Sequence, residues 1–244
     1  MERLFVFLIG LCVGSFLNVL ADRLPRGESV LWGRSHCDHC KKTLRWYELI
    51  PLVSFLVQGG RCRRCRKKLS IQYPLVELVT AIGFVLLYPY HISFYLVFIS
   101  LLVIFVADLK SQIIPDSMIV LGFAATILSW YGRSMPVGDI PQYAATGLAC
   151  FVVFYLIWMV TRGKGLGFGD VKFAPLMGVL LGFPGVIIAF YVAFLTGAAA
   201  GVILILGRKK TWKSKIAFGP FLVLGTVVVW VWQPQLTALW RMFI

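Results

Sequence analysis

Two aspartates stand where an apolar segment meets a polar loop, a place where a carboxylate needs a functional reason. Asp170 follows glycines in Gly165-Leu166-Gly167-Phe168-Gly169-Asp170-Val171-Lys172, and Asp108 closes an earlier apolar run. A charge at membrane depth costs about 2.5–3.5 kcal/mol on insertion scales. Two neighbouring carboxyl groups share a proton, so that one can activate a water while the other polarises a carbonyl. Such a pair could hydrolyse a peptide bond without a metal or a covalent nucleophile.

The composition predicts that helices in a membrane position these acids. Of the 244 residues, 59% are hydrophobic and 14% are charged, against roughly 45–50% apolar residues in soluble domains. We expect an all-α polytopic membrane protein with about eight transmembrane helices and a small cytoplasmic zinc-binding loop domain. Apolar runs long enough for such helices are expected at residues 4–21, 73–89, 93–108, 117–131, 142–161, 172–184, 185–207 and 216–232.

The basic residues predict how the chain crosses the bilayer. There are 24 Lys and Arg against 10 Asp and Glu, a net charge of +14. Enrichment of cytoplasmic loops in Lys and Arg explains this excess without nucleic acid, so no nucleic-acid partner is expected. With the N-terminus outside and the first apolar segment retained as a helix, 21 of the 24 fall in cytoplasmic loops. Both termini are then outside, and Asp108 and Asp170 both lie at the cytoplasmic face.

Residues 22–72 are the polar module of the chain. Four cysteines, Cys37, Cys40, Cys62 and Cys65, form a C-x2-C-x21-C-x2-C pattern. This spacing is typical of two knuckles that close a tetrahedral Zn²⁺ site. Two disulfides, disfavoured in a reducing compartment, and a redox pair are the alternatives. We expect a first helix at 1–21, the zinc domain at 22–72 and a peptidase domain at 73–244.

Several residues near these motifs could support a site. Glu77 lies in the first turns of an apolar segment, where it either reaches the interface or joins a polar site. Asp116 is placed to charge the start of a helix. Lys172 could tune the charge near Asp170 or mark the topology. Gly167 and Gly169 would let backbone approach an extended substrate closely.

Other functions remain open from the residues alone. Paired membrane acids also serve ion or proton transport, but those acids usually lie in mid-span, whereas these are expected at cytoplasmic helix ends. A non-enzymatic alternative makes the cysteine loop a docking platform for other proteins. The expected position favours hydrolysis of something presented at the cytoplasmic interface.

The chain resembles the bacterial type IV prepilin peptidases, membrane aspartic proteases of the G-x-G-D class, over nearly its full length. The resemblance lies in several blocks in the same order along the chain. They are Gly14-Ser15-Phe16-Leu17-Asn18-Val19 with Arg23-Leu24-Pro25, the two Cys-x-x-Cys pairs, Glu48-Leu49-Ile50-Pro51-Leu52, Tyr73-Pro74-Leu75-Val76-Glu77, Asp108 with Pro115-Asp116, and Gly167-Phe168-Gly169-Asp170-Val171-Lys172.

This resemblance implies that Asp108 and Asp170 are the catalytic pair of an enzyme in the bacterial inner membrane. The implied substrates are type IV prepilins or pseudopilins, whose short basic leader is cut after a glycine. Members with the cysteine loop are commonly also N-methyltransferases that use S-adenosylmethionine; the alternative is a peptidase only, with the zinc loop as a docking module. The candidates for binding the methyl donor are Glu77, Asn18 and Arg23.

Overall fold

The computed structural model describes residues 1–243 except 31, 38, 133–134 and 208–216, and describes side chains as far as residue 232. Within these residues the regular elements are helices, accompanied by two isolated β-bridges, His36–Thr43 and Arg61–Lys68. The expected all-helical fold is therefore confirmed for the described part of the chain. Two compact units divide it, Met1–Ile99 and Ser100–Ile244.

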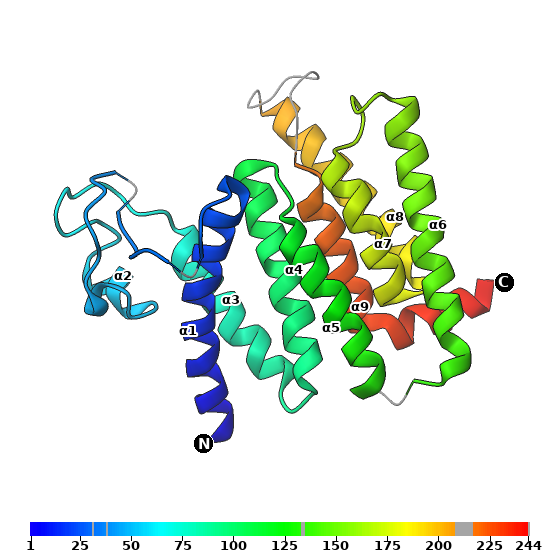
Figure 1. The fold of residues 1–244 in the computed structure, drawn as a ribbon, viewed down its shortest axis with the longest axis horizontal. Helices are drawn as coiled ribbons and strands as arrows, with labels where there is room; N and C mark the ends of the chain where they lie inside the picture. The colour runs from blue at the N-terminus through cyan, green and yellow to red at the C-terminus, as the bar shows by residue number, and fades with distance from the viewer. Residues whose placement is uncertain (31, 38, 133–134, 208–216, 244) are drawn as a thin grey trace. The chain divides into compact units, whose positions relative to one another are not determined.

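The first unit is built on the pairing of α1 (Glu2–Arg23) with α3 (Gln72–Leu87) (Figure 1). Two glycines of α1 allow this pairing, because a Cβ at Gly10 or Gly14 would lie 2.6 Å from the Cα of Ala81 or Glu77. Small residues at such crossings let helix backbones touch. The chain between the two helices carries η1 (Leu24–Arg26), η2 (Trp46–Glu48) and α2 (Val53–Val57), and α4 (Ile92–Ser111) begins in this unit.

The second unit is organised around α7 (Phe168–Leu181), which packs against four other helices. Side chains such as Phe173, Ala174 and Met177 are fully buried. Because α7 is buried on nearly every side, it needs no polar face. Its neighbours are α5 (Asp116–Gly132), α6 (Ile140–Val160, after η3, Val137–Asp139), α8 (Gly185–Leu206) and α9 (Gly219–Phe243).

Helices α6 and α7 pack closely where Gly147 of α6 meets Gly178 of α7. A Cβ at Gly178 would lie 2.7 Å from the Cα of Gly147 and 2.9 Å from its nitrogen. The second glycine of the same G-x-x-x-G, Gly182, follows the end of α7 with φ of 64° and lies against the ring of Tyr143. The two backbones are thus in contact at Gly178, which positions the helix that carries Asp170.

We expect Gly178→Ala to lower the thermal stability of the purified protein, because its methyl group would force α6 and α7 apart. Overpacking of this kind typically costs about 1–3 kcal/mol. Thermal unfolding in detergent measures the effect. Gly138→Ala is the control, since a Cβ there meets nothing within 4 Å; equal midpoints for the two variants would contradict the prediction.

The helices agree with the expected segments, but they differ in whether they are long and apolar enough to cross a membrane. Among the described residues, four helical segments are long and apolar enough: Glu2–Arg26, Ile92–Ser111, Val137–Val160 and Gly185–Leu206. Only 17% of the apolar window is buried in each of the last two, so most of that surface faces outward, as in helices against lipid. Gln72–Leu87 and Gly219–Trp232 are shorter apolar helices. The chain is thus a membrane protein, and a crossing by eight helices stays a prediction.

The helix that carries Asp170 begins earlier than the sequence predicts. The helix expected from residue 172 begins at Phe168, because Gly167 is extended and the Asp170 side chain caps the new helix end. Asp170 therefore lies inside the first turn rather than before it. The basic loop expected after α8 (208–215) lies outside the described residues.

Candidate functional site

Both aspartates belong to the second unit and lie at the ends of helices. Asp108 is in the last turn of α4 and Asp170 in the first turn of α7, and they are 5% and 7% exposed. The two carboxyl groups are close enough to interact electrostatically. The structure therefore brings together the two acids that the sequence left far apart.

Ile114 and two glycines connect the acids. A Cβ at Gly169, beside Asp170, would lie 3.2 Å from Ile114 Cβ, and a Cβ at Gly219 would lie 3.2 Å from Ile114 Cδ1. The same Gly219 Cβ would lie 2.6 Å from Asp108 Oδ2. The end of α4, the start of α7 and the start of α9 thus converge on one isoleucine, and glycine at 219 leaves room for the carboxyl group.

The two carboxyl groups differ in their hydrogen bonds. Asp170 Oδ2 accepts the Gly167 N–H at 3.2 Å, which holds this acid against its own helix start. Asp108 Oδ2 is buried and has no hydrogen-bond partner in the described part of the chain. An unsatisfied buried oxygen costs about 1–3 kcal/mol and is a recurring feature of catalytic groups. Asp170 is thus held by a hydrogen bond of good geometry, whereas Asp108 lies beside the backbone of Gly219 without one, so that Oδ2 can accept from a substrate or a water.

Lys172 and Asp116 join the starts of α7 and α5 rather than the acid pair. Lys172 Nζ lies 2.8 Å from both carboxylate oxygens of Asp116 and 5.2 Å from the centre of the Phe168 ring. Phe168 also contacts Trp158, with ring centres 5.2 Å apart. Asp116 is the first residue of α5, as expected. Because its side chain is 68% exposed, the ion pair adds little stability and serves chiefly to orient the helix start.

The four cysteines of the loop meet in one cluster within the first unit. The sulfur atoms of Cys37, Cys40, Cys62 and Cys65 all lie within 4.8 Å of one another, and Cys37 and Cys65 Sγ are 3.9 Å apart. Sulfurs around a tetrahedral Zn²⁺ with Zn–S of about 2.3 Å are separated by about 3.8 Å. A disulfide needs about 2.05 Å, so the four sulfurs are free thiols in this structure, and their spacing could hold a metal ion.

Two knuckles with matching backbones hold the sulfurs. Cys37 N–H donates to Lys42 O and Cys62 N–H to Lys67 O, each at 3.0 Å. The residue after the second cysteine of each pair turns with positive φ, 56° at Lys41 and 55° at Arg66. The sequence predicted the cysteine pairs. It did not indicate the positive φ at Lys41 and Arg66, because lysine and arginine do not favour that conformation.

The pKa values of the two buried thiols, Cys37 and Cys62, are shifted in opposite directions. Backbone N–H groups of Cys65 and Arg64 lower the pKa of Cys62 to about 7, whereas burial raises the pKa of Cys37 to about 11. A bound cation would deprotonate both, since metal-bound thiols are thiolates. The donor set of four sulfurs fits zinc by number and spacing.

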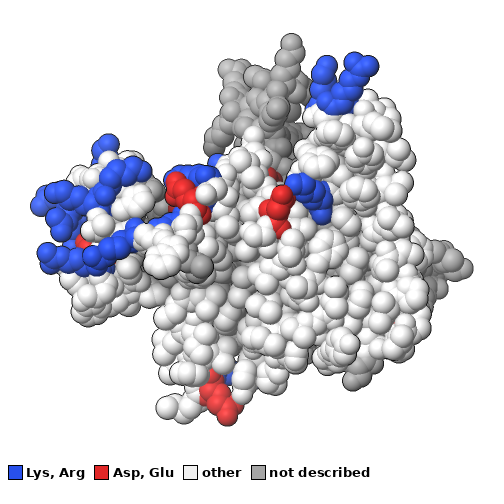
Figure 2. Space-filling model, in the orientation of Figure 1, with Lys and Arg blue, Asp and Glu red and all other residues white. Residues whose placement is uncertain are grey.

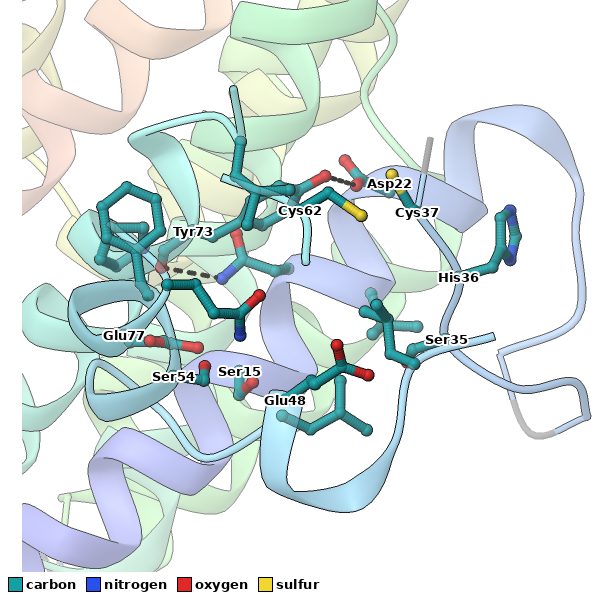
Figure 3. A pocket seen from close by; sticks show the side chains of 18 of the residues that line it. Ser15, Asp22, Ser35, His36, Cys37, Glu48, Ser54, Cys62, Tyr73 and Glu77 are labelled. Atoms are coloured by element: carbon teal, nitrogen blue, oxygen red, sulfur yellow. Dashed lines mark hydrogen bonds between the residues drawn. The ribbon is translucent and has the colours of Figure 1, made fainter. Parts of the chain in front are cut away.

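A cavity in the first unit lies between α1, the start of α3 and the cysteine loop (Figure 3). Its volume is about 190 Å³ and it is partly open to the surface, so it is smaller than the ~300–1,000 Å³ typical of ligand pockets. Glu77, Asn18 and Arg23 all line it. The sequence proposed these three as methyl-donor candidates without any reason to place them together, and the structure brings them to one cavity.

Arg23 and Glu77 make different contacts at the cavity. Arg23 donates to the backbone carbonyls of Ser29, Trp32 and Arg34, so its guanidinium shapes the loop. Glu77 is 7% exposed, and its Oε2 accepts the N–H of Leu52 at 2.8 Å, where φ is 57°. Glu77 is therefore a buried side chain in the cavity wall, bonded to the loop, and its part in a polar site stays a prediction.

Sequence reasoning missed several residues around both places. Gly219 and Ile114 beside the acids, and Ser54 and the Tyr73–Asp22 hydrogen bond of 3.2 Å at the cavity, were not singled out for a site. Gly219-Pro220 at a helix start, after a basic loop, repeats the glycine-then-helix pattern of Gly169-Asp170 and could have indicated the first. The cavity residues carry no comparable signal.

Two family models together match most of the chain. Residues 8–91 match the bacterial Peptidase A24 N-terminal domain, and residues 95–202 match the type IV leader peptidase family. The first match contains the cysteine cluster and the cavity, and the second contains both aspartates. No solved structure matches the chain.

Relatives from several bacteria carry the name prepilin leader peptidase/N-methyltransferase. The protein of Pseudomonas aeruginosa is 31% identical over 98% of this chain and 93% of its own, and that of Bacillus subtilis is 33% identical over 93% of each. The protein of Myxococcus xanthus is 37% identical over 84% of this chain, which spans 64% of that protein's length.

Proposed function

The chain belongs to the type IV leader peptidase family, and on that premise we propose that it cleaves the leader of type IV prepilins or pseudopilins. Asp108 and Asp170 are the catalytic acid–base pair of this proposal. The observation that carries it is the meeting of two buried carboxyl groups at the ends of α4 and α7, around Ile114. Gly167, which borders the Asp170 carboxyl group, would let an extended peptide approach closely, whereas Gly169 makes room for Ile114.

The proposed roles of the two acids follow from the chemistry of a carboxyl pair. Two adjacent buried carboxyl groups share one proton, because both cannot ionise easily. The ionised acid takes a proton from a water, which attacks the scissile carbonyl, while the protonated acid donates to the carbonyl oxygen. The proton then passes to the leaving amine. Asp108, with its free Oδ2, suits the partner that changes its hydrogen bonds during the reaction, and Asp170 is held by Gly167 N–H.

The same proposal includes N-methylation of the new amino terminus with S-adenosylmethionine, the second activity in the relatives' name. Cys37, Cys40, Cys62 and Cys65 would bind a structural Zn²⁺ that holds the loop. We associate methyl transfer with the 22–72 domain and the helix ends that border it, and proteolysis with the 73–244 domain. Bound at the four cysteines, the ion would keep the loop folded.

The proposed topology puts both activities on the cytoplasmic side of the bacterial inner membrane. Eight helices cross, with the N- and C-termini outside, as the distribution of 21 of the 24 basic residues favours. The partners are the lipid bilayer and the prepilin, whose apolar segment lies in the same bilayer. Figure 2 shows Lys and Arg gathered on the loop of the first unit, as a cytoplasmic position requires.

Mass measurement on a co-expressed prepilin tests both activities at once. We expect a product that lacks the leader and carries one added methyl group on its new terminal residue. Unprocessed prepilin beside a correctly inserted enzyme would overturn the proposal. A cleaved but unmethylated product, with metal bound and the methyl donor supplied, would limit the protein to a peptidase.

A further inference from the structure

The cavity of the first unit is acidic although it lies in a strongly basic part of the chain. Its lining includes the carboxylates of Asp22, Glu28, Glu48 and Glu77 and the guanidiniums of Arg23 and Arg26. Arg23 is engaged by three backbone carbonyls, and Arg26 Nη1 lies 4.0 Å from Glu28. Cys37 and Cys62, two of the cluster's thiols, add to this wall. The lining therefore favours a cation.

Asn18 adds a fixed hydrogen-bond acceptor to the cavity wall. This side chain is 4% exposed, and its Nδ2 donates to Gly14 O at 3.3 Å and to Tyr73 O at 3.1 Å. Because both neighbours are carbonyl oxygens, the amide can take only this orientation. Asn18 Oδ1 is then left buried with no hydrogen-bond partner in the described residues. A buried acceptor of this kind can take a hydrogen bond from a ligand or a water that enters the cavity.

Glu77 lies next to Asn18 through shared neighbours. It follows Tyr73 by one helical turn and packs against Gly14, the two residues whose carbonyls bind the Asn18 amide. Figure 3 shows Glu77 beside Ser15 and Ser54 at one end of the cavity. An acceptor oxygen and a carboxylate thus stand close together on one wall, an arrangement that suits an ammonium or amine.

We infer that this cavity is the methyl-transfer site, where the methyl donor meets the new α-amino group of the cleaved pilin, and that Asn18 Oδ1 accepts a hydrogen bond from that amino group. The inference rests on the proposed methyltransferase function. Both ligands carry a positive centre, a sulfonium in one and an ammonium in the other, and the acidic lining matches both. The hydrogen bond to Asn18 aims the nitrogen at the methyl carbon.

The reaction balances with groups already present. The α-ammonium gives one proton to a carboxylate of the wall, and the neutral nitrogen forms a bond to the methyl carbon with its lone pair. The carbon–sulfur bond breaks, and its electron pair stays on sulfur as a neutral thioether. The product is a secondary methylammonium, so the single positive charge moves from sulfur to nitrogen.

Cavity occlusion tests the location. In the full-length purified protein, Val19→Trp places a large side chain into the cavity wall, while Leu8→Trp adds the same side chain on the exposed face of the same helix, where Leu8 is 51% exposed. We expect Val19→Trp to lose S-adenosylmethionine binding and methylation, and to cleave prepilin like Leu8→Trp. Undiminished methylation by Val19→Trp would overturn the inference and leave the proposed function intact, whereas absent methylation by the wild type would overturn the proposed function itself.

Asn18→Leu tests the role of the amide. We expect kcat/KM for methylation of a synthetic peptide with the mature pilin terminus to fall about tenfold or more, as for one lost hydrogen bond, while affinity for S-adenosylmethionine stays within about threefold. A loss confined to methyl-donor affinity, or an unchanged kcat/KM for the peptide, would assign Asn18 no amine-binding role. If Asn18→Leu fails to fold, Asn18→Ser gives the same comparison with a smaller side chain.

Discussion

Asp108→Asn and Asp170→Asn are each expected to abolish leader cleavage. Asparagine has the shape of aspartate but can neither take a proton from water nor deliver one to the scissile carbonyl. General acid–base groups contribute typically ~10²–10⁴-fold to rates, and a dyad that shares one proton loses both roles at once. We therefore expect a residual rate at least ~10³-fold below wild type. The measurement is the mass of a co-expressed prepilin, with membrane insertion of each variant confirmed.

The matched control is Asp139→Asn, which changes an exposed acid at the end of η3 and outside the pair and should cleave at the wild-type rate. Stability separates a catalytic role from a structural one. Because Asp108 Oδ2 lacks a hydrogen-bond partner among the described residues, Asp108→Asn removes a costly buried oxygen charge and should not lower the thermal midpoint. Cleavage by either Asn variant at more than about a tenth of the wild-type rate would reject the assignment.

The helical segments could be predicted because apolar length is a local property of the chain. All eight expected segments are helices, and the most informative error is the start of α7 at Phe168 instead of residue 172. Apolar content begins near Val171, whereas the helix begins where Gly167 is extended and Asp170 accepts its N–H. Capping chemistry, and not hydropathy, fixes that end.

The pairing of distant residues was the part that sequence could not supply. Charge counting placed Asp108 and Asp170 on one face of the membrane, but no periodicity shows that Gly219 and Ile114 would lie beside them. Gly178 belonged to a G-x-x-x-G, yet its contact, Gly147 on α6, is set by tertiary packing. The cysteine cluster is the exception, because its ligand spacing carries the geometry of a metal site within the sequence.

Removal of the metal is expected to unfold the cysteine loop and abolish methylation while cleavage continues. Structural zinc contributes about 10–16 kcal/mol to the folding of small modules, and loss of one thiolate removes much of that. Cys62→Ser, or chelation, should therefore release the metal and collapse the wall that Cys37 and Cys62 form at the cavity. Cleavage persists because Asp108 and Asp170 belong to the other compact unit. Metal content and the mass of the prepilin product measure the two effects.

The control is Cys12→Ser, since Cys12 is exposed on α1 and is not among the four clustered cysteines.

The pH dependence of metal binding gives a second test of the same cysteine cluster. Backbone N–H groups of Cys65 and Arg64 lower the pKa of Cys62 to about 7, so its thiolate exists above that pH and is lost as the pH falls through it. Zinc affinity should therefore fall as the pH falls, because the metal must displace a proton from Cys37 at any pH below about 11 and also from Cys62 below about 7. A reductant should leave methylation unchanged. Loss of methylation on reduction would instead indicate that the four cysteines form disulfides and not a metal site.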